Sequence, residues 1–216
     1  YYTNMFSGEQ VDRSNSLGGR NKLIWAINDR WKLENVFSME YSTEGGYPYA
    51  LLNDSLMTAE HINYNQPSSY ERNLVSDGLV LTYSGSNIAF TSTTSYQFLD
   101  DRQEIDQDFT PDSLYFVVQD QLQHMVSQEF ILRSARPDSR YSWLAGAYGF
   151  TQRFNKQVDV DVYATNMLLQ KGYRNSISGA ALFHQSTLND FLVKSLALTA
   201  GIRADFERDD LDYVYD

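Results

Sequence analysis

The chain has 216 residues and no cysteine, which excludes a disulfide scaffold, a thiolate metal site and a cysteine nucleophile. Its 17 basic and 28 acidic residues give a formal net charge of −11, which argues against binding a nucleic-acid backbone or docking on anionic lipid through a basic patch. Aromatic residues reach 14%, with 16 Tyr and 12 Phe against only 4 Pro, a composition typical of β-structure.

Apolar and polar residues alternate with a period of two in several segments, which predicts β-strands with one oily and one charged face. In the clearest segment, Leu198, Ile202 and Phe206 alternate with Arg203, Asp205 and Glu207. We expect eight strands, at residues 19–27, 31–41, 74–83, 88–98, 124–134, 141–152, 178–188 and 196–206. No window approaches 18 consecutive apolar residues, so no transmembrane helix is expected.

The connectors between these strands alternate in length. Short turns are expected at 28–30, 84–87, 135–140 and 189–194, and long connections at 42–73, 100–123 and 153–177. In an up-and-down meander every second connector emerges at the same rim, so all short turns fall at one rim and all long loops at the other. Outer-membrane barrels have this asymmetry, and their strands are about 9 to 11 residues long.

Aromatic side chains near the strand ends fit the interfacial girdles of such barrels. The residues concerned are Trp31, Tyr41, Tyr83, Tyr96, Phe98, Tyr148, Phe150 and Phe206. The same alternation would also serve a water-soluble sandwich or barrel with an inner core, so that reading stays open.

Ser127-Gln128-Glu129-Phe130, followed after a turn by Trp143-Leu144-Ala145-Gly146-Ala147-Tyr148, resembles two adjacent strands of TonB-dependent outer-membrane receptors of the siderophore-receptor type. Ala181-Leu182-Phe183 leading to residues 198–207 is similar to a second pair, although His184 stands where the family more often has a small residue. Shorter matches are Tyr2-Thr3-Asn4 with Val11-Asp12, Gly19-Arg20 before Leu23-Ile24-Trp25, and the loop Gly45-Gly46-Tyr47-Pro48-Tyr49.

The resemblance implies an all-β, antiparallel up-and-down meander, about eight strands of a larger transmembrane β-barrel of the 22-strand type. Residues 1–216 are then expected to be a partial barrel domain from the middle of the wall, without plug and without C-terminal strand. The implied function is TonB-dependent uptake of a ferric siderophore or similar scarce nutrient in the outer membrane of a Gram-negative bacterium. The implied partners are outer-membrane lipid, the plug domain of the same parent chain, TonB and a small-molecule chelate or nutrient. No nucleic acid and no cofactor are expected.

Two groups of residues are candidates for function. The inward face should form a charged wall that lines the lumen, and its charges are expected mainly to pair with one another. Its members are Lys32, Glu34, Glu40, Glu129, Arg133, Arg203, Asp205 and Glu207. If the resemblance holds, ligand capture belongs to the outer loops, where aromatic rings can stack on or hydrogen-bond to a chelate. The candidates there are Tyr47, Tyr49, His61 and Tyr64.

Catalytic and metal-binding patterns are absent from the sequence. It contains no G-x-S-x-G, H-E-x-x-H, Walker or Rossmann motif, and its three histidines lack ligand spacing, so we expect no enzyme and no metal site. The acidic stretch from Asp100 to Asp112 does not fit an EF-hand, because Pro111 and Val117 stand where Gly and Glu are needed. Two alternatives to the receptor therefore remain: a porin-like passive channel and a soluble β-rich ligand-binding domain.

Overall fold

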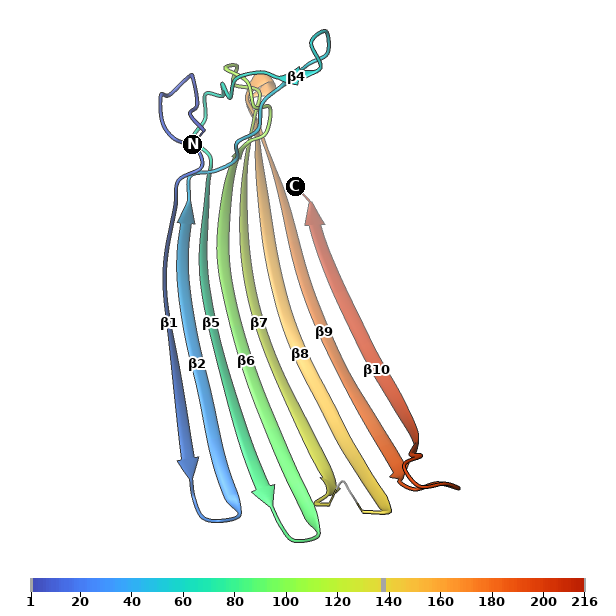
Figure 1. Cartoon of the computed structure of the whole chain (residues 1–216). Coiled ribbons are helices and arrows are strands. Elements are labelled where there is room, and N and C mark those ends of the chain that lie inside the picture. Colours follow the sequence, from blue (N-terminus) through green and yellow to red (C-terminus); the bar gives the residue numbers. More distant parts are fainter. Residues whose placement is uncertain (1, 137–138, 216) are drawn as a thin grey trace.

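The computed structural model describes residues 2–136 and 139–215, which form one curved antiparallel sheet with loops gathered at one end (Figure 1). Its eight strands follow one another in sequence order: β1 (Ser14–Ala26), β2 (Trp31–Glu44), β5 (Ser69–Ser84), β6 (Ile88–Asp106), β7 (Tyr115–Ser134), β8 (Tyr141–Val162), β9 (Met167–Leu188) and β10 (Leu198–Tyr215). The predicted eight-stranded meander is therefore confirmed. A two-stranded hairpin, β3 (Leu52–Asn53) with β4 (Thr58–Ala59), and one 3-10 turn, η1 (Tyr163–Thr165), lie in the loops. Within the described ranges, no helix is long and apolar enough to cross a membrane.

Tight connections join the strands at the end opposite the loops. The first of these turns is held by Asn28, whose Oδ1 accepts hydrogen bonds from the backbone N–H groups of Arg30 at 2.9 Å and Trp31 at 3.0 Å. Trp31 of β2 and Tyr83 of β5 then pack with their ring centroids 4.8 Å apart. The predicted turns at 28–30, 84–87 and 189–194 lie in the connections of hairpins, and the one at 135–140 lies partly outside the described residues. We call this end of the sheet the turn end.

The connection after β2 is long as predicted, from residue 45 to residue 68, but the other two long connections were predicted wrongly, because most of their residues are strand. β6 runs on to Asp106 and β7 begins at Tyr115, so the expected loop 100–123 shrinks to residues 107–114. Likewise β8 continues to Val162 and β9 begins at Met167, so the expected loop 153–177 shrinks to residues 163–166. Period-two alternation of hydrophobicity needs one dry face, whereas backbone pairing does not. The alternation therefore ends where both faces become polar, although the sheet continues.

The register divides the side chains between two faces that differ in exposure. On β2 the odd-numbered residues Phe37, Met39 and Tyr41 are 39%, 53% and 43% exposed, whereas the even-numbered Ser42 is 4% exposed. Cross-strand partners share a face, so the same surface includes Leu182 on β9 and Ile202 on β10, exposed by 67% and 74%. We call this the convex face and the opposite one the concave face.

The convex face has an apolar band with a sharp upper edge. On β6 its residues are apolar or neutral from Ile88 to Phe98, and from Asp100 the same face is charged. The change falls between Thr151 and Arg153 on β8 and between Phe206 and Arg208 on β10. Each strand thus has about 9 to 11 residues in the band, a height of about 25 Å, which is the apolar height of a membrane barrel.

Polar side chains inside the convex apolar band bind one another. Asn35 Nδ2 donates to Asp77 Oδ1 at 2.7 Å. Gln128 links two residues of β6: it accepts from Thr94 Oγ1 at 2.6 Å and donates to Ser92 Oγ at 2.9 Å. Since an unpaired polar group is costly away from water, these pairings explain how the band tolerates them.

Six of the eight aromatic residues expected in interfacial girdles lie on the convex face, but Tyr148 and Phe150 do not. Register pairs Tyr148 with Glu129 and Phe150 with Gly179, all on the concave face. A Cβ on Gly179 would lie 2.5 Å from the Phe150 ring, so the ring fills the space above this glycine. These two rings therefore lie on the concave face, away from the convex apolar band, and the girdle prediction was wrong for them.

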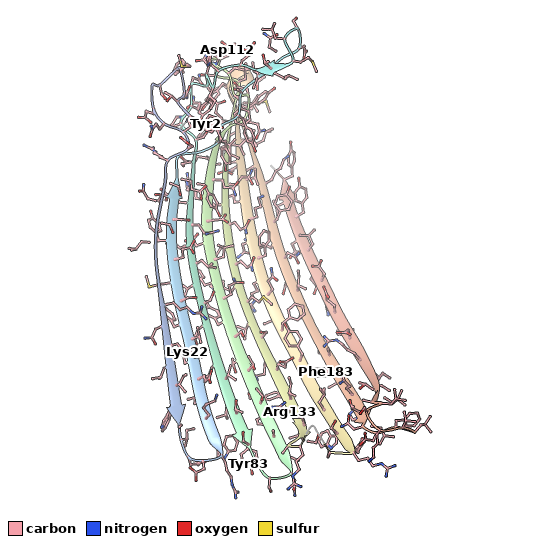
Figure 2. All side chains as sticks on the ribbon, viewed as in Figure 1. Tyr2, Lys22, Tyr83, Asp112, Arg133 and Phe183 are labelled. Carbon is pink, nitrogen blue, oxygen red and sulfur yellow. The ribbon has the colours of Figure 1, made fainter. Side chains whose placement is uncertain are left out.

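The one hydrophobic cluster found in the described residues lies among the loops. Val11, Ile62 and Tyr64 are buried, and Ala50 and Phe109 pack against them. Nothing packs on the convex apolar band in the described part of the chain, as the sticks on the open sheet in Figure 2 show.

Candidate functional site

The eight charges predicted for an inner wall all lie on the concave face. Glu34 binds Lys32 and Lys22, with N–O distances of 2.6 and 3.4 Å. Glu40 pairs with Arg72 of β5, and Arg203 binds Asp205 two residues along β10 at 2.7 Å. The side chains in these pairs are 22% to 59% exposed, so water screens each pair and it contributes only modestly to stability. The concave face is thus a wet, largely charge-paired surface.

Small polar residues make a shallow hollow halfway along this surface. Its lining comes from five neighbouring strands and includes Arg20, Ser38, Gly78, Ser95, Gln97 and Ser127. Short side chains leave the sheet backbone accessible there, while Arg20 and Gln97 supply the longer polar groups. Val36 and Met125 also line it, so the hollow is mostly but not wholly polar.

Nearer the loops the concave face becomes tyrosine-rich. Tyr70 Oη donates to Asp101 Oδ2 at 3.3 Å, and Tyr47 Oη, from the loop after β2, donates to Gln103 Oε1 at 3.4 Å. Burial raises the pKa of Asp101, although the hydrogen bond from Tyr70 lowers it in part. Burial likewise raises the pKa of Tyr70, and the nearby charge of Asp101 adds to that rise. Asp101 is 7% exposed, so this carboxylate is tightly enclosed.

The same register rows continue to the far strands, where more aromatic residues lie. Tyr173 on β9 and Tyr213 on β10 have ring centroids 5.0 Å apart. Lys171 Nζ lies 5.4 Å from the ring centroid of Tyr215, within the range of a cation–π contact. One group lies on β5, β6 and the loop after β2 and the other on β9 and β10, with β7 and β8 between them. We call the two groups together the upper concave site: Tyr47, Tyr70, Asp101, Gln103, Lys171, Tyr173, Tyr213 and Tyr215. Its phenols and its ammonium group can stack on, hydrogen-bond to or neutralise a polar ligand.

Three segments pack together at the loop end of the sheet. Asn4 Nδ2 donates to the carbonyl of Tyr64 at 2.7 Å, and Asn4 Oδ1 accepts from the Tyr64 N–H at 3.2 Å. Asp106, which is fully buried, accepts from the N–H groups of Gln66 at 2.9 Å and Phe109 at 3.1 Å. These bonds tie the N-terminal segment to the loops after β2 and β6, and we call the unit the loop cap.

Three of the four predicted ligand residues of the loops, Tyr47, Tyr49 and Tyr64, are connected by ring contacts, because Phe109 packs edge-on against both Tyr49 and Tyr64, whereas His61 lies apart. Tyr47 and Tyr49 stack with ring centroids 6.1 Å apart and nearly parallel planes. Tyr64 is 2% exposed in the loop cap, so its ring supports the loops. His61 is exposed beside the β3–β4 hairpin, in a shallow surface hollow with Glu60 and Asn63. Tyr47 and Tyr49 are the pair whose position suits contact with a ligand.

The acidic stretch from Asp100 to Asp112 spans the end of β6 and the loop after it, and two of its carboxylates hold that loop in place. Asp106 ties the loop cap together, and Asp108 accepts hydrogen bonds from the backbone N–H groups of Thr110, Leu114 and Tyr115. Burial by itself raises the pKa of Asp108, but the hydrogen bonds from Thr110, Tyr115 and Leu114 outweigh it and lower that pKa. Among the described residues no group of three or more histidines and carboxylates is arranged to hold a metal ion.

Solved structures identify the fold. The ferric yersiniabactin uptake receptor FyuA from Yersinia pestis matches 98% of this chain with a TM-score of 0.74. The sheet has the fold of a receptor-barrel wall. Sequence identity over the match is 14%, so the likeness concerns the fold alone, and the chain spans 37% of the receptor. Pseudomonas aeruginosa OccK10 (OpdN) also aligns, at 8% identity and a TM-score of 0.15, which is too low to support an argument. No family model matches the sequence.

Sequence reasoning missed most of the upper concave site. Tyr70, Asp101, Gln103, Tyr173 and Lys171 fell in stretches interpreted as loops. A signal was available in Gln119, Gln121 and Gln123, whose spacing keeps a period of two inside the supposed loop. Polar alternation without hydrophobic contrast is a weak pattern, which explains the omission.

Proposed function

We propose that this chain is a section of an outer-membrane receptor barrel that takes up a ferric siderophore or a similar scarce nutrient. In this proposal the convex apolar band contacts lipid tails and the concave face lines a lumen. The observation that carries it is the match of 98% of the chain to a siderophore-receptor fold, combined with an apolar band of membrane height that no part of the described chain covers.

The bare convex band also weighs against a soluble binding domain. A soluble sandwich would pack its apolar face against a second layer. Here Phe206, Ile202 and Leu182 are 67% to 74% exposed, and the buried hydrophobic cluster lies in the loop cap. Large contiguous apolar surfaces of this kind are typical of membrane or protein contacts.

Ligand capture is proposed for the upper concave site, with Tyr49 beside it. Tyr47, in the loop after β2, hydrogen-bonds to Gln103 of β6, so a ligand bound here would touch both loop and wall. The tyrosines offer faces for stacking, and Lys171 supplies a positive charge suited to an anionic chelate. The charged wall, including Glu129, Arg133 and Glu207, is proposed to line the path below. Energy supply through a plug domain of the parent protein and TonB, as in the family that the sequence resembles, is part of this proposal.

The test is uptake of radioactive iron(III) by iron-starved cells that produce the full-length protein. Iron is supplied as catecholate, hydroxamate, phenolate or carboxylate chelates, with and without a protonophore. The proposal predicts saturable uptake of at least one chelate that the protonophore abolishes. It also predicts that Tyr47→Ala with Tyr49→Ala lowers the apparent affinity about tenfold, the loss expected for about 1.4 kcal/mol of ring contacts.

His61→Ala is the matched control, because its side chain lies in the same loop but away from the concave face. Non-saturable diffusion of chelates and sugars, insensitive to the protonophore, would instead indicate a passive channel. Folding to a monodisperse protein without detergent would contradict the membrane placement itself.

A further inference from the structure

The connection between β9 and β10 is unlike the polar turn between β5 and β6. That turn is the short sequence Gly85-Ser86-Asn87, whereas residues 189–197 form a longer segment rich in apolar residues, which we call the β9–β10 loop. Leu192 is 85% exposed and its neighbour Val193 is 61% exposed. Two adjacent aliphatic side chains at the tip of a loop are costly in water, so this tip is suited to contact with something apolar.

The backbone of the β9–β10 loop is strained. Asp190, Leu192 and Ser195 have φ angles of 52°, 64° and 68°, in the left-handed region that is unfavourable for residues other than glycine. Internal hydrogen bonds hold this shape: the Phe191 N–H donates to the Leu196 carbonyl at 2.7 Å, and the Ser195 N–H donates to Asp190 Oδ1 at 2.9 Å. Backbone strain of this kind is typical of functional segments, and here it presents the apolar tip in one fixed conformation.

The β9–β10 loop begins at the lower edge of the convex apolar band. Leu188 ends β9 on the convex face, and the register places Tyr141 of β8 and Leu198 of β10 beside it. Tyr141 and Leu198 are 54% and 50% exposed, so this edge is open. Tyrosine is typical of the boundary between acyl chains and headgroups, so the loop starts at the depth of that boundary. From there it projects sideways at the foot of the sheet (Figure 1).

The chemistry of the tip suits a lipid surface. Lys194 follows the two aliphatic residues and is exposed, so its ammonium group can contact lipid phosphate while Leu192 and Val193 reach the acyl chains. A stable protein contact would bury about 800 Å² on each partner, far more than two side chains provide. Lipid binding instead grows with each apolar side chain that enters the interface.

We propose that the β9–β10 loop is a membrane anchor at the turn end, with Leu192 and Val193 inserted just below the headgroups and Lys194 bound to phosphate. The inference rests on the proposed membrane placement and adds to it one specific point of attachment. Such an anchor fixes the height of β9 and β10 in the bilayer, which the Gly85-Ser86-Asn87 turn lacks the apolar side chains to do.

The test uses the full-length protein in vesicles of phosphatidylcholine and phosphatidylglycerol, with any cysteine outside these residues replaced by serine. A fluorophore is attached to single cysteines: Leu192→Cys in the loop, Ser86→Cys in the polar turn and Leu182→Cys in the band. Lipids that carry a nitroxide near the headgroup and aqueous iodide are the two quenchers. The nitroxide lipid should quench the label at Leu192 at least about twofold more strongly than the label at Ser86, and iodide should show the reverse order.

Quenching at Leu192 by iodide alone, together with lipid quenching at Leu182, would overturn the anchor and leave the membrane placement intact. Protection of the Leu192 label from both quenchers would show that a protein surface covers the loop, and it would also overturn the anchor. Absence of lipid quenching at all three positions would show that the membrane placement itself is wrong.

Glycine substitutions distinguish an anchor from a loop that is merely strained. Glycine adopts a φ of 64° without strain, so Leu192→Gly should leave folding unchanged or favour it if the leucine contacts nothing. The anchor predicts the opposite: the folding equilibrium constant in vesicles should fall about fivefold, because the lipid contact is lost. Ser195→Gly, at a φ of 68°, is the matched control and should not lower that constant. Equal effects of the two substitutions would overturn the anchor.

Discussion

A single lysine placed on either face at mid-depth distinguishes a lipid-facing surface from a lumen-facing one. Leu182 of β9 and Thr93 of β6 lie on opposite faces near the middle of the apolar band, which covers residues 178–188 and 88–98 of these strands. Leu182 lies on the convex face, 67% exposed, between Ala147 and Ala204. Thr93 lies on the concave face between Val80 and Glu129.

Lysine at the lipid midplane of a membrane barrel costs about 2 to 4 kcal/mol, which lowers the folding equilibrium constant about 30- to 900-fold. Leu182→Lys should lose that amount of unfolding free energy. Thr93→Lys should lose less than about 1 kcal/mol, because its ammonium group reaches water in the lumen. The assay is equilibrium unfolding by guanidinium in phosphatidylcholine vesicles. Similar losses for the two variants, or a larger loss for Thr93→Lys, would refute the assignment of the faces.

Three further predictions concern packing, polar pairing and pH. Gly146→Ala should destabilise the sheet by about 1 to 3 kcal/mol, because its Cβ would meet the Phe183 ring and lie 2.8 Å from a backbone oxygen. Gly149→Ala is the control, since a Cβ there has its nearest contact at 3.6 Å, and thermal unfolding of the two variants checks the difference. Asn35→Leu should cost about 1 to 3 kcal/mol, since it leaves Asp77 without its partner, and adding Asp77→Leu should restore most of that loss in a double-mutant cycle. The pKa of Asp108 is lowered in the folded state, so its stabilising effect is present above the ordinary Asp pKa of about 3.9 and is lost as the pH falls through the lower folded-state pKa. Protection of the Leu114 and Tyr115 amides from hydrogen exchange should therefore fall only in that acidic range. Constant protection there would contradict this prediction.

The sheet was predictable wherever one face of a strand is apolar. Trp31 to Tyr41 and Leu198 to Phe206 show full hydrophobic contrast, and their strand assignment and sidedness are confirmed. Around Asp100 and Arg174 the contrast disappears, because both faces of the sheet are polar there. The strands continue through backbone hydrogen bonds, which leave little trace in the sequence.

The candidate site was predictable only in part, for the same reason. Loop composition pointed to Tyr47 and Tyr49, but it could not separate them from Tyr64, which has the same chemistry and lies buried beside Ile62. That distinction depends on contacts between segments about 60 residues apart, such as the two bonds from Asn4 to Tyr64. The charged wall was easier to predict, because alternate residues of a strand lie on the same face of the sheet. Its place in a lumen, and the position of this chain within a larger barrel, stay predictions.

The central claim is that the convex face lies in lipid up to one edge and in water above it. Since the chain has no cysteine, single cysteines can be placed along β6 from Ile88 to Asp106 and spin-labelled in the vesicle-bound protein. Accessibility to oxygen and to a water-soluble nickel complex is then measured at each position. Even-numbered positions up to Phe98 should favour oxygen with a period of two, and positions from Asp100 should favour nickel on both faces. Accessibility without that period, or without a change between Phe98 and Asp100, would contradict the account.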